Sequence, residues 1–259
     1  MSAQPVAAGL LDPLDIKLEQ HYSELTAVPK LGMPGELLEH IEHIETPELH
    51  GGPSTASLAN AHNQTGVTSM RGTYGLAGRG QTVAVIDSGI AYDHRALGAG
   101  FGVGHRVVGG WDFAENDANP YDDGPSGFHG THVAGIVGSA DGLHRGVASS
   151  ADLVALRVFD DNGAGNFRWV EQALQWVHDH RNDFANPITT VNMSLGANWN
   201  ASTTPSWAML EEELSQLKRD GIFISVSAGN SFTTFNAPGL AYPAASSFVV
   251  PVSSVTGWW

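Results

Sequence analysis

The sequence contains no cysteine, and this absence excludes disulfide bonds and thiolate metal sites from the whole chain. Basic residues are also scarce: 12 Lys and Arg stand against 27 Asp and Glu, for a formal net charge of −15. Such a balance repels phosphate groups, and it therefore argues against binding to nucleic acid or to anionic lipid. We expect no nucleic-acid partner.

Long apolar runs are missing as well. No stretch approaches the roughly 18 apolar residues of a membrane-spanning helix, so we expect no membrane span. The first residues, Met1-Ser-Ala-Gln-Pro-Val-Ala-Ala, lack a basic region followed by a long apolar one, and no signal peptide is visible. The sequence by itself assigns no compartment.

Residues 1–55 differ in composition from the rest of the chain. They are rich in Glu, His and Leu and contain no run that predicts a buried strand. The apolar residues of 35–45 have helical spacing, and Gly51-Gly-Pro53 breaks the pattern. We predict an acidic N-terminal extension or linker over 1–55 and one large domain over 56–259.

From residue 82 onward, short apolar runs recur. Continuous hydrophobicity, rather than alternation, is typical of strands buried on both faces of a parallel sheet. Helical patterns lie between several runs, one over Trp169–Val177 and another that begins after Pro205 and ends before Gly221. We predict an α/β fold, with a doubly wound, mostly parallel sheet flanked by helices. The predicted strands are 83–86, 153–159, 190–195, 222–226 and 248–252.

Two segments place reactive residues at the ends of predicted elements. Asp87 follows the run Val83-Ala-Val-Ile86 and so lies at the carboxyl end of a strand, where open α/β sheets bind ligands. His129 opens His-Gly-Thr-His-Val-Ala-Gly135, a small apolar segment that predicts the start of a helix. Taken singly, such residues are also typical of helix caps and turns. The histidines lack the His-Glu-x-x-His pattern of a zinc site.

Together and in this order, the two segments resemble the aspartate and histidine signatures of the subtilisin-like serine proteases (subtilases). The resemblance implies a subtilisin-like α/β fold and endopeptidase activity on polypeptides in extended conformation. It also implies that Asp87 orients the imidazole and that His129 acts as general base in an Asp-His-Ser charge relay. The family is mostly extracellular.

Further segments follow in the order of that family. Ser227-Ala-Gly-Asn230 resembles the oxyanion-hole segment, which implies that the Asn230 amide stabilises the tetrahedral intermediate. Gly163-Ala164-Gly165 and Ser194-Leu195-Gly196 resemble the two edge segments that hold an extended substrate. Glycines let a peptide backbone come close, and strand edges offer it hydrogen bonds. Tyr242-Pro-Ala resembles the wall of the S1 pocket, where the Tyr-Pro bond is commonly cis, although X-Pro bonds in general favour trans.

The sequence departs from this family at its strong calcium site. That site uses an Asp after the loop of the catalytic aspartate, where this chain has Ala96, and an Asn-bearing loop after the histidine helix, which is shorter here at 139–146. We expect this site to be absent, and the sequence assigns no metal ligands and no certain cofactor. Calcium could bind at Asp122-Asp123 or Asp160-Asp161, although surface acid pairs usually hold only water.

The nucleophile segment of the family, Gly-Thr-Ser-Met-Ala-x-Pro, has no counterpart after Asn230. The serines in that stretch flank the last predicted strand and lack this context. Gly66-Val-Thr-Ser69-Met70 is the one similar stretch, and it precedes Asp87, so Ser69 would require a circular permutation. We interpret the chain as the N-terminal portion of a subtilisin-like endopeptidase, truncated before its nucleophile and inactive alone. A C-terminal segment would then be the partner that supplies the serine.

Two other hypotheses remain. One is a non-catalytic pseudoprotease module that grips extended peptides through residues 163–165 and 194–196. The other is a metal-binding protein, although a solvated face of an amphipathic helix also explains its ligand set. That set is Glu39, His40, Glu42, His43 and His50.

Overall fold

The computed structural model describes residues 42–43, 58–124 and 128–253. Its main sheet has six parallel strands in the order β3-β4-β2-β5-β7-β9. The strands that follow β2 in the chain lie on both sides of it, because β4 pairs with one edge of β2 and β5 pairs with the other. The carboxyl end of β2 is therefore a topological switch point. The strands are β2 (Thr82–Asp87), β3 (Val107–Asp112), β4 (Asp152–Arg157), β5 (Ile188–Met193), β7 (Phe223–Ser227) and β9 (Val250–Val252).

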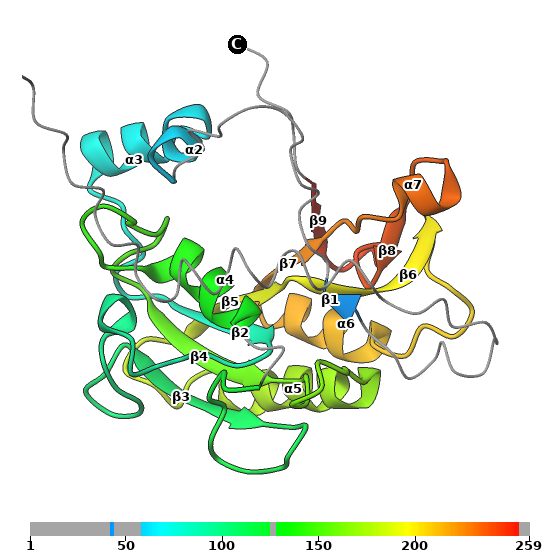
Figure 1. Cartoon of the computed structure of the whole chain (residues 1–259), viewed down its shortest axis with the longest axis horizontal. Helices are drawn as coiled ribbons and strands as arrows, with labels where there is room; N and C mark the ends of the chain where they lie inside the picture. The colour runs from blue at the N-terminus through cyan, green and yellow to red at the C-terminus, as the bar shows by residue number, and fades with distance from the viewer. Residues whose placement is uncertain (1–41, 44–57, 125–127, 254–259) are drawn as a thin grey trace, which may run out of the picture. The chain divides into compact units, whose positions relative to one another are not determined.

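Helices flank both faces of this sheet (Figure 1). On one face, α4 (His129–Gly138) contacts β2 and β4. On the other, α5 (Phe167–His180) packs beside α6 (Glu211–Arg219), and these helices contact β2 and β7 respectively. The charges of α6 suit the helix dipole, with three Glu in the first turn and Lys218 and Arg219 in the last. The predicted α/β fold, with helices on a mostly parallel sheet, is confirmed.

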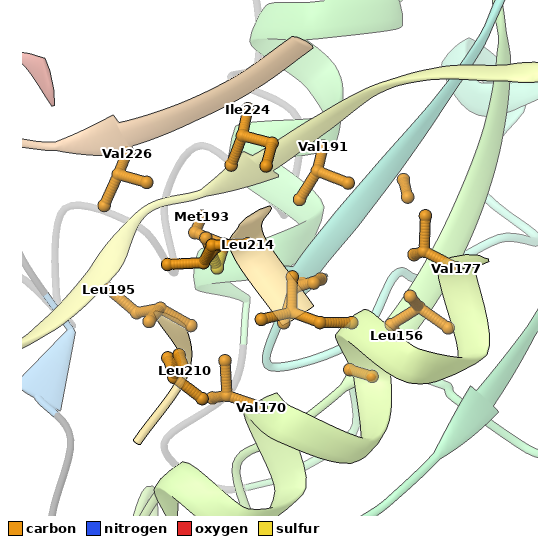
Figure 2. Close-up of a cluster of buried hydrophobic side chains, with 14 of the residues drawn as sticks. Leu156, Val170, Val177, Val191, Met193, Leu195, Leu210, Leu214, Ile224 and Val226 are labelled. Atoms are coloured by element: carbon orange, nitrogen blue, oxygen red, sulfur yellow. The ribbon is translucent and has the colours of Figure 1, made fainter. Parts of the chain in front are cut away.

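The larger core lies between the sheet and the pair α5–α6 (Figure 2). Val191 and Met193 of β5 point toward this layer, as do Ile224 and Val226 of β7. Helix α5 meets them with one apolar face that includes Val170, Leu174 and Val177, all fully buried. Burying each such side chain contributes about 1.5–3 kcal/mol. This core fixes the strands whose carboxyl ends carry the predicted site.

A second, smaller sheet is antiparallel and has the order β1-β6-β8. It comprises β1 (Glu42–His43), β6 (Leu195–Ala201) and β8 (Leu240–Tyr242). The helical spacing at 35–45 was misleading at Glu42 and His43, because pairing with the edge of β6 overrides the local pattern. The rest of that stretch, the predicted boundary near residue 55, and Glu39, His40 and His50 lie outside the described residues.

Short helices complete the described part of the chain. They are α2 (Leu58–Gln64), α3 (Val67–Tyr74), the 3-10 helix η1 (Arg95–Leu97) and α7 (Phe232–Phe235). Ser69, the weak alternative nucleophile, lies in α3. Within the described ranges, no helix is both long and apolar enough to cross a membrane.

The sheet face that carries α4 continues over β5, β7 and β9. The strand register places side chains of all three strands on this face, which we call the open sheet face. In the described part of the chain, Phe223, Val250 and Val252 are 52%, 44% and 52% exposed, so this face presents accessible apolar side chains beside polar ones. Its residues are Thr190, Asn192, Phe223, Ser225, Ser227, Val250 and Val252.

Candidate active site

Asp87 and His129 meet at the switch point of the sheet. Nδ1 of His129 lies 2.8 Å from Oδ1 of Asp87. The Asp87 side chain is fully buried, whereas that of His129, the first residue of α4, retains 12% exposure. The same carboxylate oxygen accepts the Ser88 N–H at 2.7 Å. A carboxylate that accepts the Nδ1 proton leaves Nε2 as the basic nitrogen of a neutral imidazole.

Gly130 explains how helix and strand come this close. A Cβ at Gly130 would lie 2.2 Å from the carbonyl oxygen of Gly89 and 3.1 Å from Cβ of Asp87. The first distance is shorter than any contact that a side chain tolerates, so α4 could not begin here with a larger residue. The small residue after His129 is thus a geometric condition for the short Asp87–His129 distance.

Asp122 is a second carboxylate beside this pair. The expectation that it belongs to a surface acid pair is wrong, because its exposed fraction is 1%. Oδ1 accepts Ser88 Oγ–H at 3.0 Å and Phe128 N–H at 2.9 Å. Oδ2 accepts the Thr131 N–H at 2.9 Å and its Oγ–H at 2.6 Å. Burial raises the pKa of Asp122, and these hydrogen bonds oppose that shift. Four donors around two oxygens suit an ionised carboxylate.

Asn230, the predicted oxyanion donor, lies just beyond the carboxyl end of β7 and is exposed. Gly229 precedes it with φ of 100°, a backbone conformation that glycine adopts without strain. The strands β2 and β7 are parallel and belong to one sheet, with β5 between them. Asn230 and Asp87 therefore lie at the same end of the sheet, where the carboxyl ends of the strands meet.

The predicted edge segment Ser194–Gly196 leads from β5 into β6. The side chain of Leu195 is fully buried in the core, so only its backbone is available for pairing. That backbone is paired with β1, in which Glu42 lies opposite Gly196 and His43 opposite Leu195. The edge that the resemblance assigns to substrate thus carries a short antiparallel strand of the same chain.

The other predicted edge segment, Gly163–Gly165, closes a turn after β4. Phe159 and Gly165 form an isolated antiparallel bridge. The Asp160 N–H donates to the Ala164 carbonyl at 3.0 Å, and the Ala164 N–H donates to Asp160 Oδ1 at 2.9 Å. Both backbone groups of Ala164 therefore stabilise the turn itself. The segment shares the sheet edge at which β2 and β7 end, because it follows the parallel strand β4.

Tyr242, predicted as part of a pocket wall, has a fully buried side chain. Its ring packs against Phe167 and Trp207, and its hydroxyl oxygen accepts the Leu210 N–H at 2.9 Å. Burial raises the pKa of this hydroxyl above its ordinary value. The Tyr242–Pro243 peptide bond is cis. The ring therefore lies on the core side of the predicted wall.

Arg157, which the sequence analysis did not single out, lies opposite Asp87 in the β2–β4 register. Its side chain is 3% exposed. The guanidinium donates to the carbonyls of Tyr121 at 3.0 Å and Phe159 at 2.9 Å. It also pairs with Asp123 and Asp161 at 2.9 and 2.5 Å. Arg157 thus ties the loop that carries Asp122 to the turn that carries Gly163–Gly165. The sequence signal that could have identified Arg157 is the presence of a charged residue inside the apolar run 153–159.

The acidic pairs considered for calcium have other partners. Asp122 is surrounded by donors, Asp123 and Asp161 pair with Arg157, and Asp160 accepts N–H groups of its own turn. In the 139–146 loop, Asp141 Oδ1 likewise accepts two backbone N–H groups. These contacts do not fit a cation at either pair. Among the described residues, no group of three or more His, Cys, Asp and Glu is placed to hold a metal.

Comparison with known proteins agrees with this geometry. The sequence profile described as the Subtilase family matches residues 78–257. Subtilisin E of Bacillus subtilis is 31% identical over 251 residues, which cover 96% of this chain and 55% of that protein. A thermostable alkaline protease of Halalkalibacterium halodurans is 33% identical over 206 residues, covering 79% of this chain and 46% of the relative.

Serine protease AprX of Bacillus subtilis is 31% identical over 185 residues, which cover 70% of this chain and 39% of the relative. The chain thus spans about half the length of the first of these relatives, 55% in the case of subtilisin E. The matched range, 78–257, spans Asp87, His129 and Asn230. The chain belongs to the subtilase family, whose members resemble subtilisin.

Proposed function

We propose that this chain supplies the Asp-His part of the charge relay of a serine endopeptidase, together with its substrate-binding edges. The observation that carries the proposal is the 2.8 Å contact between His129 Nδ1 and the buried Asp87 carboxylate at the switch point of the sheet. In this arrangement Asp87 holds the tautomer with the proton on Nδ1. Nε2 then takes the proton of an attacking serine hydroxyl, and the carboxylate stabilises the imidazolium that forms.

Asn230 is the proposed donor to the oxyanion of the tetrahedral intermediate. Its exposure at the same sheet edge as Asp87 supports this role. One such side-chain donor contributes about 3 kcal/mol of transition-state stabilisation. We expect Asn230→Ala to lower kcat far more than KM in a protein that carries the complete triad. The chemistry proposed for these residues needs no cofactor.

The serine itself is proposed to come from a further segment that packs on the open sheet face. Phe223, Val250 and Val252 are exposed apolar side chains of this face in the described part of the chain, and the face lies on the same side of the sheet as α4. Exposed apolar patches of this kind favour a packing partner. Without the serine we expect the chain to be inactive, since loss of the nucleophile lowers the kcat of subtilisin by about 10⁶.

The proposed substrate is a polypeptide in extended conformation. The antiparallel pairing of Leu195 and Gly196 with β1 supports it, because the same edge accepts an extended strand through backbone hydrogen bonds. Backbone pairing is largely independent of side-chain identity, so it suits an enzyme that acts on many sequences.

Two measurements test this proposal. We expect the coding sequence downstream of Trp259 to contain an in-frame Gly-Thr-Ser-Met-Ala segment. The protein extended through that segment should hydrolyse a generic peptide substrate and react with a fluorophosphonate, whereas its His129→Ala variant should do neither. The 259-residue chain should be inert in both assays. Hydrolysis by this chain that is lost in His129→Ala would show that it contains a nucleophile of its own.

A second candidate is a non-catalytic peptide-binding module. The occupied edge of β6 favours it, because strand pairing there requires no catalytic residue. In this case the chain should bind extended peptides, and its His129→Ala variant should bind them with the same affinity. Gly163→Leu should abolish that binding. The same should hold for the longer protein that includes the segment downstream of Trp259. Peptide binding through this edge without cleavage in that protein would favour the module over the enzyme.

A further inference from the structure

We propose that Asp122 is a positioning residue for the Asp87–His129 pair, acting through Ser88 on the aspartate side and through the first turn of α4 on the histidine side. The inference rests on the proposed function, because it assigns a role relative to that pair. The hydrogen bonds of Asp122 are with Ser88, Phe128 and Thr131, so its role differs from that of Asp87, which contacts the His129 ring directly.

On the aspartate side, the link is the hydroxyl of Ser88. Ser88 follows Asp87 directly, and its N–H donates to the Asp87 carboxylate. Its Oγ–H donates to Asp122 Oδ1 at 3.0 Å, and its oxygen accepts the N–H of Gly130 at 2.9 Å. The hydroxyl thus has a fixed orientation. It connects the residue after Asp87 to the residue after His129.

On the histidine side, Asp122 provides the cap that α4 lacks locally. The N-cap residue Phe128 makes no side-chain cap, and its φ of 104° is strained for a bulky residue. Asp122 accepts the N–H groups of Phe128 and Thr131, which lie on either side of His129. A carboxylate at a helix N-terminus is also favoured by the helix dipole. One buried anion therefore holds the backbone on both sides of His129.

Thr131 closes the network. Its hydroxyl donates to Asp122 Oδ2 at 2.6 Å and accepts the N–H of Ala91 at 2.8 Å. Ala91 belongs to the loop that follows Asp87. Asp122 thus contacts the loop after β2 by two routes, through Ser88 and through Thr131. A change at Asp122 should alter the relative placement of β2 and α4, on which the 2.8 Å contact depends.

The experiment follows the Nδ1 proton of His129 by NMR in the 259-residue chain with ¹⁵N-labelled histidine. Asp122→Asn keeps the shape but replaces one acceptor oxygen with an NH₂ group, which faces donors. We expect the Nδ1 proton to exchange with solvent about tenfold faster, the effect of weakening one charge-assisted hydrogen bond. Asp141→Asn is the matched control, because Asp141 also accepts two backbone N–H groups, at 2.9 Å each, in the loop after α4. Its exchange rate should equal that of the wild type.

A second variant separates positioning from simple loss of the helix. Ser88→Ala removes the link to Asp87 but leaves the contacts of Asp122 with Phe128 and Thr131. It should also accelerate Nδ1 exchange while the amide exchange of Ile136 and Val137 in α4 stays unchanged. In the double variant, Nδ1 exchange should accelerate by less than the two single effects combined, because both changes interrupt the same route.

The outcomes distinguish the two proposals. A wild-type chain without a protected Nδ1 proton would contradict the Asp87–His129 pair and hence the proposed function. A protected proton that exchanges equally in the wild type, Asp122→Asn and Asp141→Asn would overturn the role of Asp122 alone. If Asp122→Asn unfolds α4, Ser88→Ala decides, and unchanged Nδ1 exchange in that variant overturns the proposal.

Discussion

Glu42 lies opposite Gly196 in an antiparallel pair, and His43 lies opposite Leu195 in the same pair. Leu195 and Gly196 belong to the edge segment that we predict to hold substrate. An extended peptide would pair with the same backbone groups. If the edge holds substrate as predicted, the chain's own strand β1 and a peptide would compete for it.

Competition predicts that weakening β1 increases peptide affinity. The double substitution Glu42→Pro with His43→Pro removes both N–H groups from the strand and disfavours pairing. We expect extended peptides to bind several-fold more tightly, because the fraction of molecules with a vacant edge rises. Fluorescence anisotropy of a labelled peptide measures this.

The matched control for this experiment keeps the backbone donors. Glu42→Ala with His43→Ala removes the same side chains but retains both N–H groups, and its affinity should stay close to that of the wild type. Equal affinities in the proline and alanine pairs would show that β1 does not cover the binding edge.

A second prediction concerns the start of α4. Gly130→Ala places a Cβ 2.2 Å from the Gly89 carbonyl oxygen, so helix and strand must separate. We expect a loss of about 1–3 kcal/mol in the free energy of unfolding, the usual cost of overpacking, measured by chemical denaturation. The Nδ1 signal of His129 should weaken in parallel.

Gly135→Ala is the control within the same helix. A Cβ at Gly135 would meet nothing within 4 Å, so this substitution should stabilise the chain by about 0.5–1 kcal/mol through helix propensity. A Gly130→Ala variant as stable as Gly135→Ala would contradict the close approach of α4 to β2.

The sequence predicted β2 and β4 as strands buried on both faces, because continuous apolar runs such as Val83–Ile86 mark them. The runs at 222–226 and 248–252 also form strands, but the expected burial is wrong there, since Phe223, Val250 and Val252 are exposed. The sequence did not predict β3, in which Gly109 and Gly110 interrupt the pattern. A Cβ at Gly110 would lie 1.9 Å from the Ala155 carbonyl oxygen, so glycine there reflects a close approach that only the neighbouring strand reveals. Local pattern carries no information on such contacts.

The candidate site was likewise predicted only in part from the sequence. Asp87 and His129 were found because they belong to motifs that are contiguous in the sequence. Asp122 was considered only as part of an acidic pair for calcium, since its donors come from residues 88, 128 and 131 and only the fold brings them together. Strand β1 was missed for a related reason: two residues of helical spacing become extended only where the edge of β6 is available.

A third prediction concerns Arg157 and the buried Asp112. Asp112 is fully buried and lies 3.3 Å from the Arg157 guanidinium. Arg157→Met leaves this carboxylate without a counter-charge, and we expect a loss of about 3–5 kcal/mol in the free energy of unfolding. Adding Asp112→Asn should restore part of the loss, because the buried charge is then removed. Additive losses in the double variant would show that the pair is not coupled.

The last prediction concerns pH and His62 on α2. His62 is buried, and its Nε2 has no hydrogen-bond partner among the described residues. Burial lowers the pKa of His62 below 6.5, and the nearby positive charge of Arg71 lowers it further. Arg71 in turn donates to the Gly146 carbonyl at 2.7 Å, which anchors α3 beside the loop after α4. Protonation of His62 therefore opposes the docking of α2 and α3.

The sign of the effect follows from linkage. Because the folded pKa of His62 is below that of the unfolded chain, the unfolded chain binds the proton more readily, and stability is lost as pH falls below about 6.5. Thermal melts from about pH 7.5 to about pH 5.5 should show a smaller loss in His62→Phe than in the wild type, since phenylalanine cannot titrate. The exposed His105 provides the control, and His105→Phe should follow the wild-type profile. Identical profiles in His62→Phe and the wild type would mean that His62 is solvated in the folded chain, contrary to its burial beside Arg71.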